Sequence, residues 1–287
     1  MRKRIREFPA LLGVILLVLV LLLEGTKADS ALAQETQEEE KREPVNWAFA
    51  THLGTGIYTA SGRAVQVYTL PFSHGFRDAK EYNWGFKVKF PVTLGFYDFE
   101  LKDIIESGIP TDVTTVSLLP GLEFEYPIRE NWSLMPFADL GAGYNFSKDR
   151  ATYIYSAGIK SLVIFPWKDF ECRFGNTFLY AGYTTPQADV RDNYESFETG
   201  FDMRRPLPYT VLGHPTNWSV YFVNFLYLNL EFLKFLTSSF KVDVQNEFGI
   251  TAGTSDKFWW SGNPRIGLGY RFGPHFHAIR VVFGMPF

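Results

Sequence analysis

Apolar and polar residues alternate with a period of two along most of the chain. The clearest example is WGFKVKFPVTLGF, residues 84–96, where Phe86 and Val88 begin one apolar face and Lys87 and Lys89 begin the opposite, polar face. Successive side chains of an extended chain point to opposite sides. The pattern therefore predicts a β-strand with one apolar and one polar face.

The predicted strands are longer than those of ordinary soluble sheets, which have about 5–6 residues. A tilted membrane-spanning strand needs about 9–11 residues, and such lengths recur in VSLLPGLEFEY (116–126), WSLMPFADLGAGYNF (132–146), FECRFGNTFLY (170–180) and FKVDVQNEFGI (240–250). We predict twelve strands, at 46–59, 62–73, 82–97, 113–127, 131–147, 150–165, 168–184, 192–204, 209–227, 237–253, 257–272 and 276–287. Because His214 and Pro215 interrupt the ninth strand, a count of ten stays open.

The connections between these strands form two sets. Short turns are expected at 127–131, 165–169, 204–208 and 253–257, whereas the two longest connections, 98–112 and 185–192, fall at the opposite end. Outer-membrane barrels have short periplasmic turns and longer extracellular loops. The order of the strands then places both ends of the barrel domain on the periplasmic side.

Strands with one apolar face predict a closed barrel in lipid. In hydrocarbon every backbone N–H and C=O needs a partner, and an open sheet leaves two bare edges. The predicted fold class is therefore all-β: a closed, antiparallel transmembrane β-barrel of twelve strands over residues 45–287, with the apolar face outside and the polar face lining a lumen.

The chain begins with features of a secretory signal peptide. Basic residues from Arg2 to Arg6 precede an apolar core at 8–23, and Ala31-Leu32-Ala33 supplies a small-residue cleavage site. We predict a cleaved signal peptide at 1–33 and a bacterial outer-membrane location; a permanent helical anchor is the alternative. Residues 34–44 are acidic and are expected to form a short linker or a plug in the lumen.

Charge and cysteine content narrow the function classes. The chain has 28 basic and 31 acidic residues, a net charge of −3. Nucleic-acid binding needs a concentrated basic field, so we expect no nucleic-acid partner. A single cysteine, Cys172, allows neither an intramolecular disulfide nor a cysteine metal cluster.

The C-terminal segment IGLGYRFG (266–273) and HAIRVVFGMPF (277–287) resembles the C-terminal signature of outer-membrane barrels. In that signature an alternating strand that ends in Phe is read by the barrel assembly machinery. The resemblance implies that Val281, Phe283, Met285 and Phe287 form the assembly signal.

Three further stretches, LLPGLEFEYPI (118–128), NWSLMPFADLGAGYNFS (131–147) and FETGFDMRRPLP (197–208), make the chain similar to the solitary autotransporter-like outer-membrane β-barrels. That family implies a twelve-stranded, translocator-like barrel without an attached passenger. It implies no catalytic residue.

The inward faces of the predicted strands carry charged residues of both signs. The pore-lining candidates are Lys87, Lys89, Glu123, Glu125, Asp139, Asp169, Glu171, Arg173, Lys241, Asp243, Glu247, Arg265, Arg271 and Arg280; Lys160, Arg204, Glu198 and Asp202 share these faces. They can form a filter for a polar solute or a salt-bridged filling that stabilises a narrow barrel. The acidic segment 34–44 can insert against Arg265, Arg271, Arg280 and Lys87.

Known catalytic and cofactor motifs are missing from the sequence. Ser73 and His74 are adjacent but have no evident orienting carboxylate except Asp78. No H-E-x-x-H, EF-hand or Gly-rich phosphate motif occurs. We therefore predict a non-enzyme without cofactor or bound metal.

The expected function is a narrow pore or a structural envelope component. The expected partners are outer-membrane lipid and, through the last strand, the barrel assembly machinery, and the barrel is expected to be a monomer. An outer-membrane enzyme acting on lipid or peptide, and a surface adhesin or receptor with loops 98–112 and 185–192, are the alternatives.

Overall fold

The computed structural model describes residues 47–60, 63–79, 83–99, 114–188, 190–227, 244–254, 264–273 and 276–287. The elements in chain order are α2 (Trp47–Leu53), β1 (Thr55–Ala60), β2 (Arg63–Arg77), β3 (Gly85–Phe99), β4 (Thr115–Leu118), β5 (Gly121–Arg129), β6 (Trp132–Asn145), β7 (Arg150–Trp167), β8 (Phe170–Thr185), the 3-10 helix η2 (Pro186–Ala188), β9 (Val190–Val211), β10 (His214–Tyr227), β11 (Val244–Thr254), β12 (Arg265–Gly273) and β13 (Phe276–Phe283). The predicted signal peptide and the segment 34–44 lie outside the described residues.

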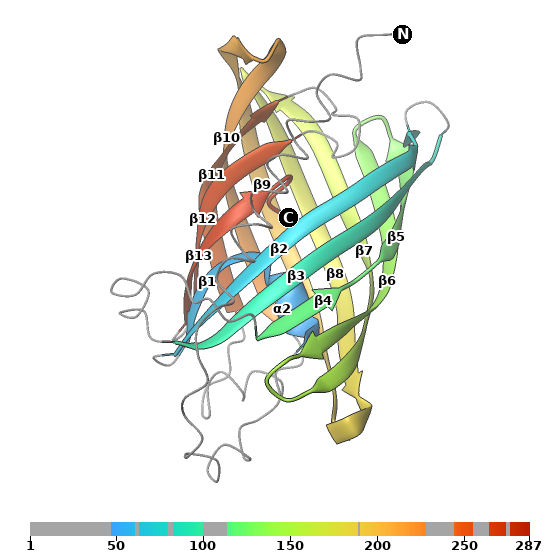
Figure 1. The fold of residues 1–287 in the computed structure, drawn as a ribbon. Helices are drawn as coiled ribbons and strands as arrows, with labels where there is room; N and C mark the ends of the chain where they lie inside the picture. The colour runs from blue at the N-terminus through green and yellow to red at the C-terminus, as the bar shows by residue number, and fades with distance from the viewer. Residues whose placement is uncertain are drawn as a thin grey trace.

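The strands form a closed antiparallel barrel (Figure 1). Each strand pairs with its neighbour in sequence, and β1 pairs with β13, with Ile57 opposite Ile279. Segments β4 and β5 both pair with β3 and with β6, so they are two halves of one strand interrupted at Leu119-Pro120. The predicted closed barrel of twelve strands is confirmed.

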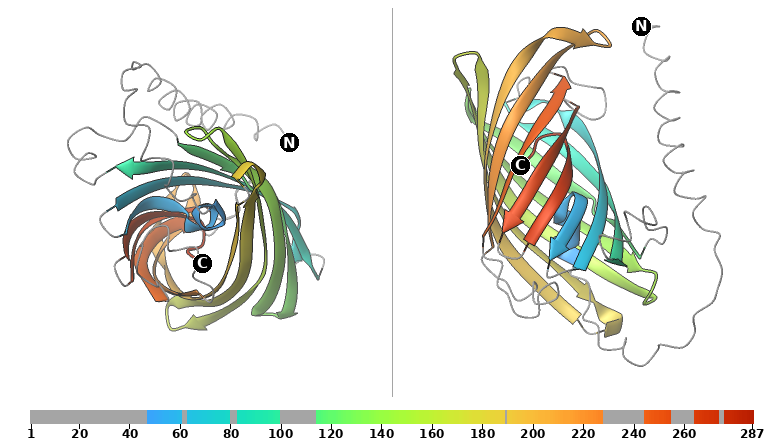
Figure 2. Two further views of the ribbon diagram at one scale, coloured as in Figure 1. Left: turned by 90° about the horizontal axis from the view of Figure 1, so that it is seen from below. Right: turned by 90° about the vertical axis from the view of Figure 1, so that its left-hand side faces the viewer.

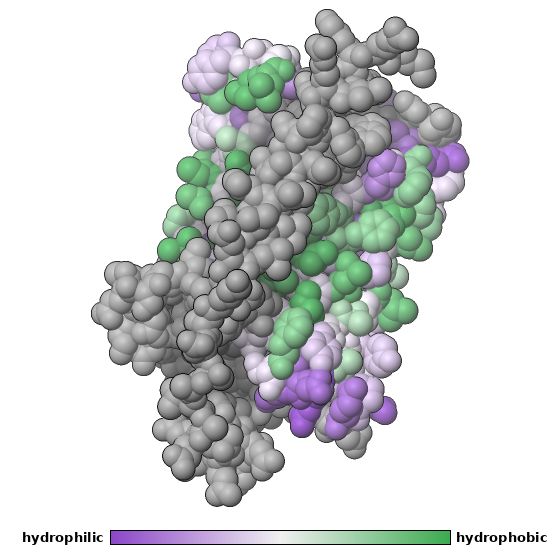
Figure 3. Space-filling view, in the orientation of Figure 1, coloured by the Kyte–Doolittle hydropathy of each residue, from purple (hydrophilic) through white to green (hydrophobic). Residues whose placement is uncertain are grey.

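The outer wall of the barrel is apolar. Large apolar side chains point outward and stay exposed, among them Leu140 at 69%, Ile250 at 59% and Ile279 at 61%. On the face shown in Figure 3, hydrophobic side chains cover the middle of the visible wall and hydrophilic ones gather toward its ends. A closed barrel with this exterior is an integral protein of the bacterial outer membrane. Among the described residues, no helix is long and apolar enough to cross a membrane.

The predicted first strand, 46–59, is wrong in its first half, because residues Trp47–Leu53 form helix α2. Figure 2 shows this helix inside the ring of strands. A helix satisfies its own backbone hydrogen bonds, so it needs no strand partner in the lumen. Gly54, with φ +78°, ends the helix in the left-handed conformation that favours glycine. The Tyr58 hydroxyl donates to the carbonyls of Leu53 and Gly54 at this end.

The last predicted strand, 276–287, is also too long. Strand β13 ends at Phe283, and Gly284, with φ +79°, turns the chain away from the wall. Figure 2 shows that the end of the chain lies within the ring. Of the expected assembly signal, Phe283 points outward, whereas the Phe287 ring packs into the lumen against Gly175 of β8 and Gly200 of β9. The signalling role of the four residues stays a prediction.

Two predicted connections differ from the structure. The predicted turn 204–208 lies within β9, which continues to Val211 and turns at Leu212-Gly213, both with positive φ. Here β9 has passed the beginning of β8 and pairs only with β10, with an irregular register beside Pro206, so the two prolines lie in an edge segment where they are tolerated. The predicted long loop 185–192 is only the short helix η2 before β9. Of the other predicted loop, 98–112, residues 98 and 99 belong to β3, and residues 100–112 lie outside the described residues.

We expect Gly200→Ala to weaken the barrel, because an added Cβ would lie 2.3 Å from the Phe287 ring. Overpacking of this kind costs about 1–3 kcal/mol of unfolding free energy. Urea unfolding of the refolded chain in detergent measures the change. Gly75→Ala is the matched control, since an added Cβ there meets nothing within 4 Å. Equal stability of the two variants would show that Phe287 does not pack against Gly200.

Candidate functional site: the barrel lumen

One cluster of charges lines the lumen on β3, β5, β6 and β7. Lys87 Nζ lies 2.5 Å from Glu123 Oε1, and Lys160 Nζ lies 3.0 Å from Glu123 Oε2. Lys89 Nζ lies 2.7 Å from Asp139 Oδ1, and Ser156 Oγ donates to Asp139 Oδ2 at 2.8 Å. We call Lys87, Lys89, Glu123, Asp139 and Lys160 the lysine cluster; it contains three bases and two acids.

The aromatic ring of Phe137 lies within the lysine cluster. Lys89 Nζ is 4.4 Å and Lys160 Nζ is 5.3 Å from the centre of the Phe137 ring. The ring attracts both ammonium groups through its π face. The backbone leaves room for it at Gly158, where an added Cβ would lie 2.6 Å from the ring.

Helix α2 brings His52 against the same cluster. Its Nε2 atom is buried and has no hydrogen-bond partner among the described residues. Burial lowers the pKa of His52 from 6.5 to about 4; Asp139 opposes the shift, while Lys89 and Lys160 add to it. His52 is therefore neutral while α2 is docked at neutral pH.

A second cluster lies near the seam at which the barrel closes, on β10, β11, β12 and β13. Glu247 accepts hydrogen bonds from Arg280 Nη1 and, at 2.8 Å, from the Tyr221 hydroxyl. Nearby, Arg271 donates to the Tyr227 hydroxyl, and its guanidinium lies 3.6 Å from the centre of the Phe225 ring. Glu247 is 0% exposed, so this polar cluster is part of the packed interior.

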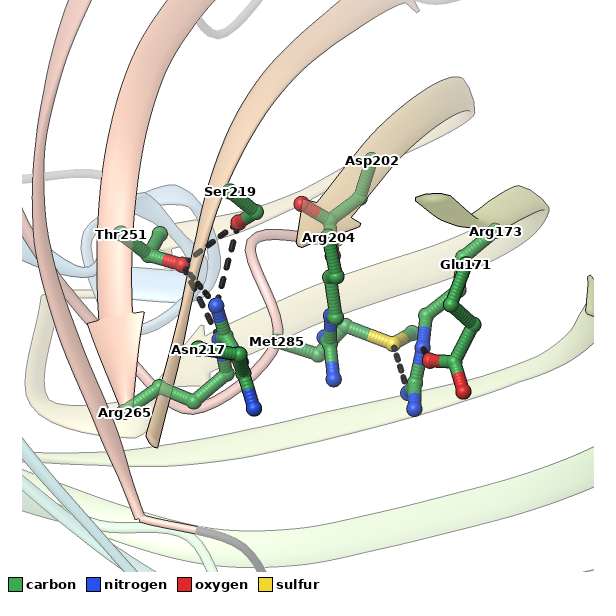
Figure 4. A network of polar contacts seen from close by, with 9 residues as sticks. All are labelled: Glu171, Arg173, Asp202, Arg204, Asn217, Ser219, Thr251, Arg265 and Met285. Carbon is green, nitrogen blue, oxygen red and sulfur yellow. Dashed lines mark hydrogen bonds and ion pairs between the residues drawn. The ribbon is translucent and has the colours of Figure 1, made fainter. Parts of the chain in front are cut away.

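A third cluster lies near the end of the lumen at which β8 begins and β9 extends past β8 (Figure 4). It contains three arginines on adjacent or nearby strands, Arg173, Arg204 and Arg265, which we call the arginine row. Arg173 Nε donates to Glu171 at 2.8 Å, and Arg204 Nε donates to Asp202 at 2.6 Å. Arg265 donates to the neutral side chains of Asn217, Ser219 and Thr251.

Most of the pore-lining candidates lie together in these three clusters. Glu125 also lies on the wall and accepts from Ser133 Oγ at 3.1 Å. Asp169 lies instead in the β7–β8 turn, where its side chain is 79% exposed and 3.6 Å from Arg205. Lys241 and Asp243 lie outside the described residues. The pore-lining role itself stays a prediction.

The sequence reasoning missed several lumen residues. Tyr58, Tyr221 and Tyr227 are buried and bind charged groups or backbone, and His52 belongs to a helix that was predicted as strand. Tyr221 and Tyr227 are an even number of residues from Ser219, which points inward from β10. The alternation along that strand therefore could have identified both tyrosines as lumen residues.

The comparisons with known proteins give fold-level similarities only. No protein-family model matches the chain, and no curated protein matches it significantly. The β domain of the Bordetella autotransporter BrkA is similar over 78% of this chain and 94% of that one, with 12% identity and a TM-score of 0.45. LpxR from Salmonella typhimurium is similar over 79% and 90%, with 10% identity and a TM-score of 0.42.

The similarity to LpxR contradicts the prediction that the chain is not an enzyme. LpxR is itself an enzyme of the outer membrane. The classification as a non-enzyme is withdrawn. With 10% identity the similarity assigns no substrate and no catalytic residue to this chain.

We expect Glu247→Ala to be strongly destabilising, because it leaves Arg280 charged and unpaired in the packed interior. Breaking a buried ion pair in this way costs about 3–5 kcal/mol. Asp169→Ala is the control: its partner Arg205 and Asp169 itself are both exposed, and such pairs contribute about 0–1 kcal/mol. Urea unfolding of both variants measures the difference, and similar losses would contradict the burial of Glu247.

We expect acid to weaken the docking of α2. The pKa of His52 is about 4 in the docked state and 6.5 when free. The contribution of the neutral imidazole to the free energy of unfolding is therefore complete above pH 6.5. It decreases as the pH falls from 6.5 to 4 and is constant below that, and the total loss is on the order of 3 kcal/mol. Unfolding of the wild type and of His52→Gln at pH 7 and pH 4 tests this. The variant should lose less stability than the wild type; equal losses would exclude His52 as the cause.

Proposed function

We propose that the chain is an autotransporter-type barrel without a passenger that works as a narrow outer-membrane pore, closed at rest by helix α2. The observation that carries the proposal is the position of α2 within the ring of strands (Figure 2). The helix packs against β2, β3, β7, β8 and β9, on several sides of the lumen. The helix therefore occupies part of the cross-section of the lumen.

The contacts of α2 favour a removable closure. Its buried side chains include the small Ala48 and Thr51, and Thr51 Oγ1 donates to the carbonyl of Ala48 in the same helix. The Nε2 atom of His52 is buried but makes no hydrogen bond with any described residue. The helix is thus held mainly by apolar packing, and Gly54 links it to β1 with a conformation that other residues rarely adopt. Such a helix can leave the lumen while β1 stays paired with β2 and β13.

The walls behind α2 favour passage of anions. If the helix leaves, the lysine cluster faces water with three positive and two negative groups. A ring of charged side chains sets ion selectivity by its net charge. The open pore should therefore prefer anions.

Planar-bilayer recordings of the refolded chain from residue 34 onward test the proposal. The wild type should be mostly closed, and a variant without residues 47–53 should give steady openings with anion preference. Removal of residues 35–43, which leaves α2 intact, is the control and should leave conductance unchanged. Openings from that control alone would assign the closure to the acidic segment instead of α2.

A point variant tests the helix without a deletion. Ala48 is 0% exposed, so Ala48→Asp places a charge where the wall leaves no room and should open the pore. Ala50, which is only partly buried, provides Ala50→Asp as the matched control. A gel that separates heat-denatured from folded chains confirms folding of each variant. Folded but silent Ala48→Asp and deletion variants would contradict a pore.

A further inference from the structure

The arginine row is placed by the strand register. Arg173 is opposite Asp202, Arg204 is opposite both Glu171 and Ser219, and Ser219 is opposite Thr251. Arg265 is the first residue of β12 and is opposite Gly253 of β11. Five consecutive strands, β8 to β12, therefore contribute inward side chains at one level of the lumen, and Figure 4 shows the three guanidinium groups turned the same way.

Arg265 is a buried cation that has no anionic partner among the described residues. It is 5% exposed, and its hydrogen bonds within the described part of the chain go to the neutral side chains of Asn217, Ser219 and Thr251. In the described part of the chain no carboxylate lies within ion-pair distance of its guanidinium. Buried charges are normally paired, because an unpaired charge loses its hydration without compensation.

Arg204 carries a second open donor. The residue is 6% exposed, and its Nε donates to Asp202. Its Nη2 atom is buried and has no hydrogen-bond partner among the described residues. This open donor is a second observation, separate from the unpaired charge of Arg265, and it lies on a different arginine of the same row.

The third arginine has a weak partner that an anion can replace. Arg173 Nη1 contacts Met285 Sδ at 3.8 Å, and a thioether is a poor acceptor for a guanidinium. The Arg173 side chain is 18% and that of Glu171 is 49% exposed, so the row is open to solvent on this side. Among the described residues, the three guanidinium groups have two carboxylate partners, Glu171 and Asp202, which leaves one positive charge.

We propose that Arg173, Arg204 and Arg265 bind the phosphate group of a small soluble solute at the periplasmic end of the lumen. Guanidinium groups match phosphate oxygens through paired, charge-assisted N–H donors. Donors from three residues suit a tetrahedral oxyanion better than a planar carboxylate, which one arginine satisfies. The row faces the lumen and not the lipid, so the ligand enters from water and is not a bilayer headgroup.

Isothermal titration of the refolded chain in detergent tests the site, with inorganic phosphate as the probe at constant ionic strength. The wild type should bind one phosphate saturably, and Arg204→Gln and Arg265→Gln should each weaken binding at least tenfold. Arg205→Gln is the matched control: Arg205 is next to Arg204 in sequence, but its side chain is 51% exposed and pairs with Asp169. Its affinity should stay within twofold of wild type.

Arg173→Gln keeps the test valid if a buried variant fails to fold, because this side chain is partly exposed. It should also weaken phosphate binding. No saturable binding to the wild type, equal affinity in the arginine-row variants and the control, or equally strong binding of succinate would each overturn the proposal. The titration needs no conductance, so its result is independent of whether the barrel is a pore.

Discussion

The pairing of β1 with β13 is the constraint on which the rest of the structure depends. Backbone N–H and C=O groups cannot be left unpaired in hydrocarbon, and closure is the way for a sheet to pair all of them. Ile57 opposite Ile279 and Tyr58 opposite Ala278 complete the ring. Once the ring is closed, each strand has one face in lipid and one face in a confined interior. The period-two alternation therefore separates apolar side chains that contact lipid from polar side chains that line the lumen.

The confined interior explains why the charges are arranged in pairs. Glu247, Asp202 and Asp139 are almost fully buried, so each must find its partner within the lumen. Antiparallel register supplies partners from neighbouring strands, as it does for Lys87 and Glu123. Helix α2 and the tail at 284–287 occupy further space between the walls. In the arginine row, neighbouring strands supply fewer carboxylates than arginines among the described residues.

The wall was predictable from sequence because alternation is a local property. The faces of β3 and β6 follow directly from residues such as Phe86 and Lys87 or Leu140 and Asp139. The contents of the lumen were not predictable in the same way. The partner of Lys160 is Glu123, 37 residues away, and only the register between strands decides that pairing.

The two ends of the barrel domain show the limit of pattern reasoning more sharply. Met285 and Phe287 continue the apolar alternation of β13, yet Gly284 and Pro286 are turn residues and the chain bends inward there. Residues 47–53 alternate well enough to be predicted as strand. Their helical form depends on the closed lumen, which offers no free strand edge but accommodates a self-paired helix.

The arginine row also bears on the idea that the acidic segment 34–44 inserts among Arg265, Arg271, Arg280 and Lys87. Arg280 is paired with Glu247, Lys87 with Glu123, and Arg271 with Tyr227 and Phe225. Of these four cations, Arg265 and Arg271 have only neutral partners in the described part of the chain.

The wall of the barrel and the helix α2 in its lumen are therefore held by different interactions. The wall depends on continuous backbone hydrogen bonds that cannot be given up in lipid, whereas α2 is held by packing of side chains such as Ala48 and Leu53 and by the Tyr58 hydroxyl at its end. If α2 leaves the lumen, as we propose, the pairing of β1 with β13 does not have to break.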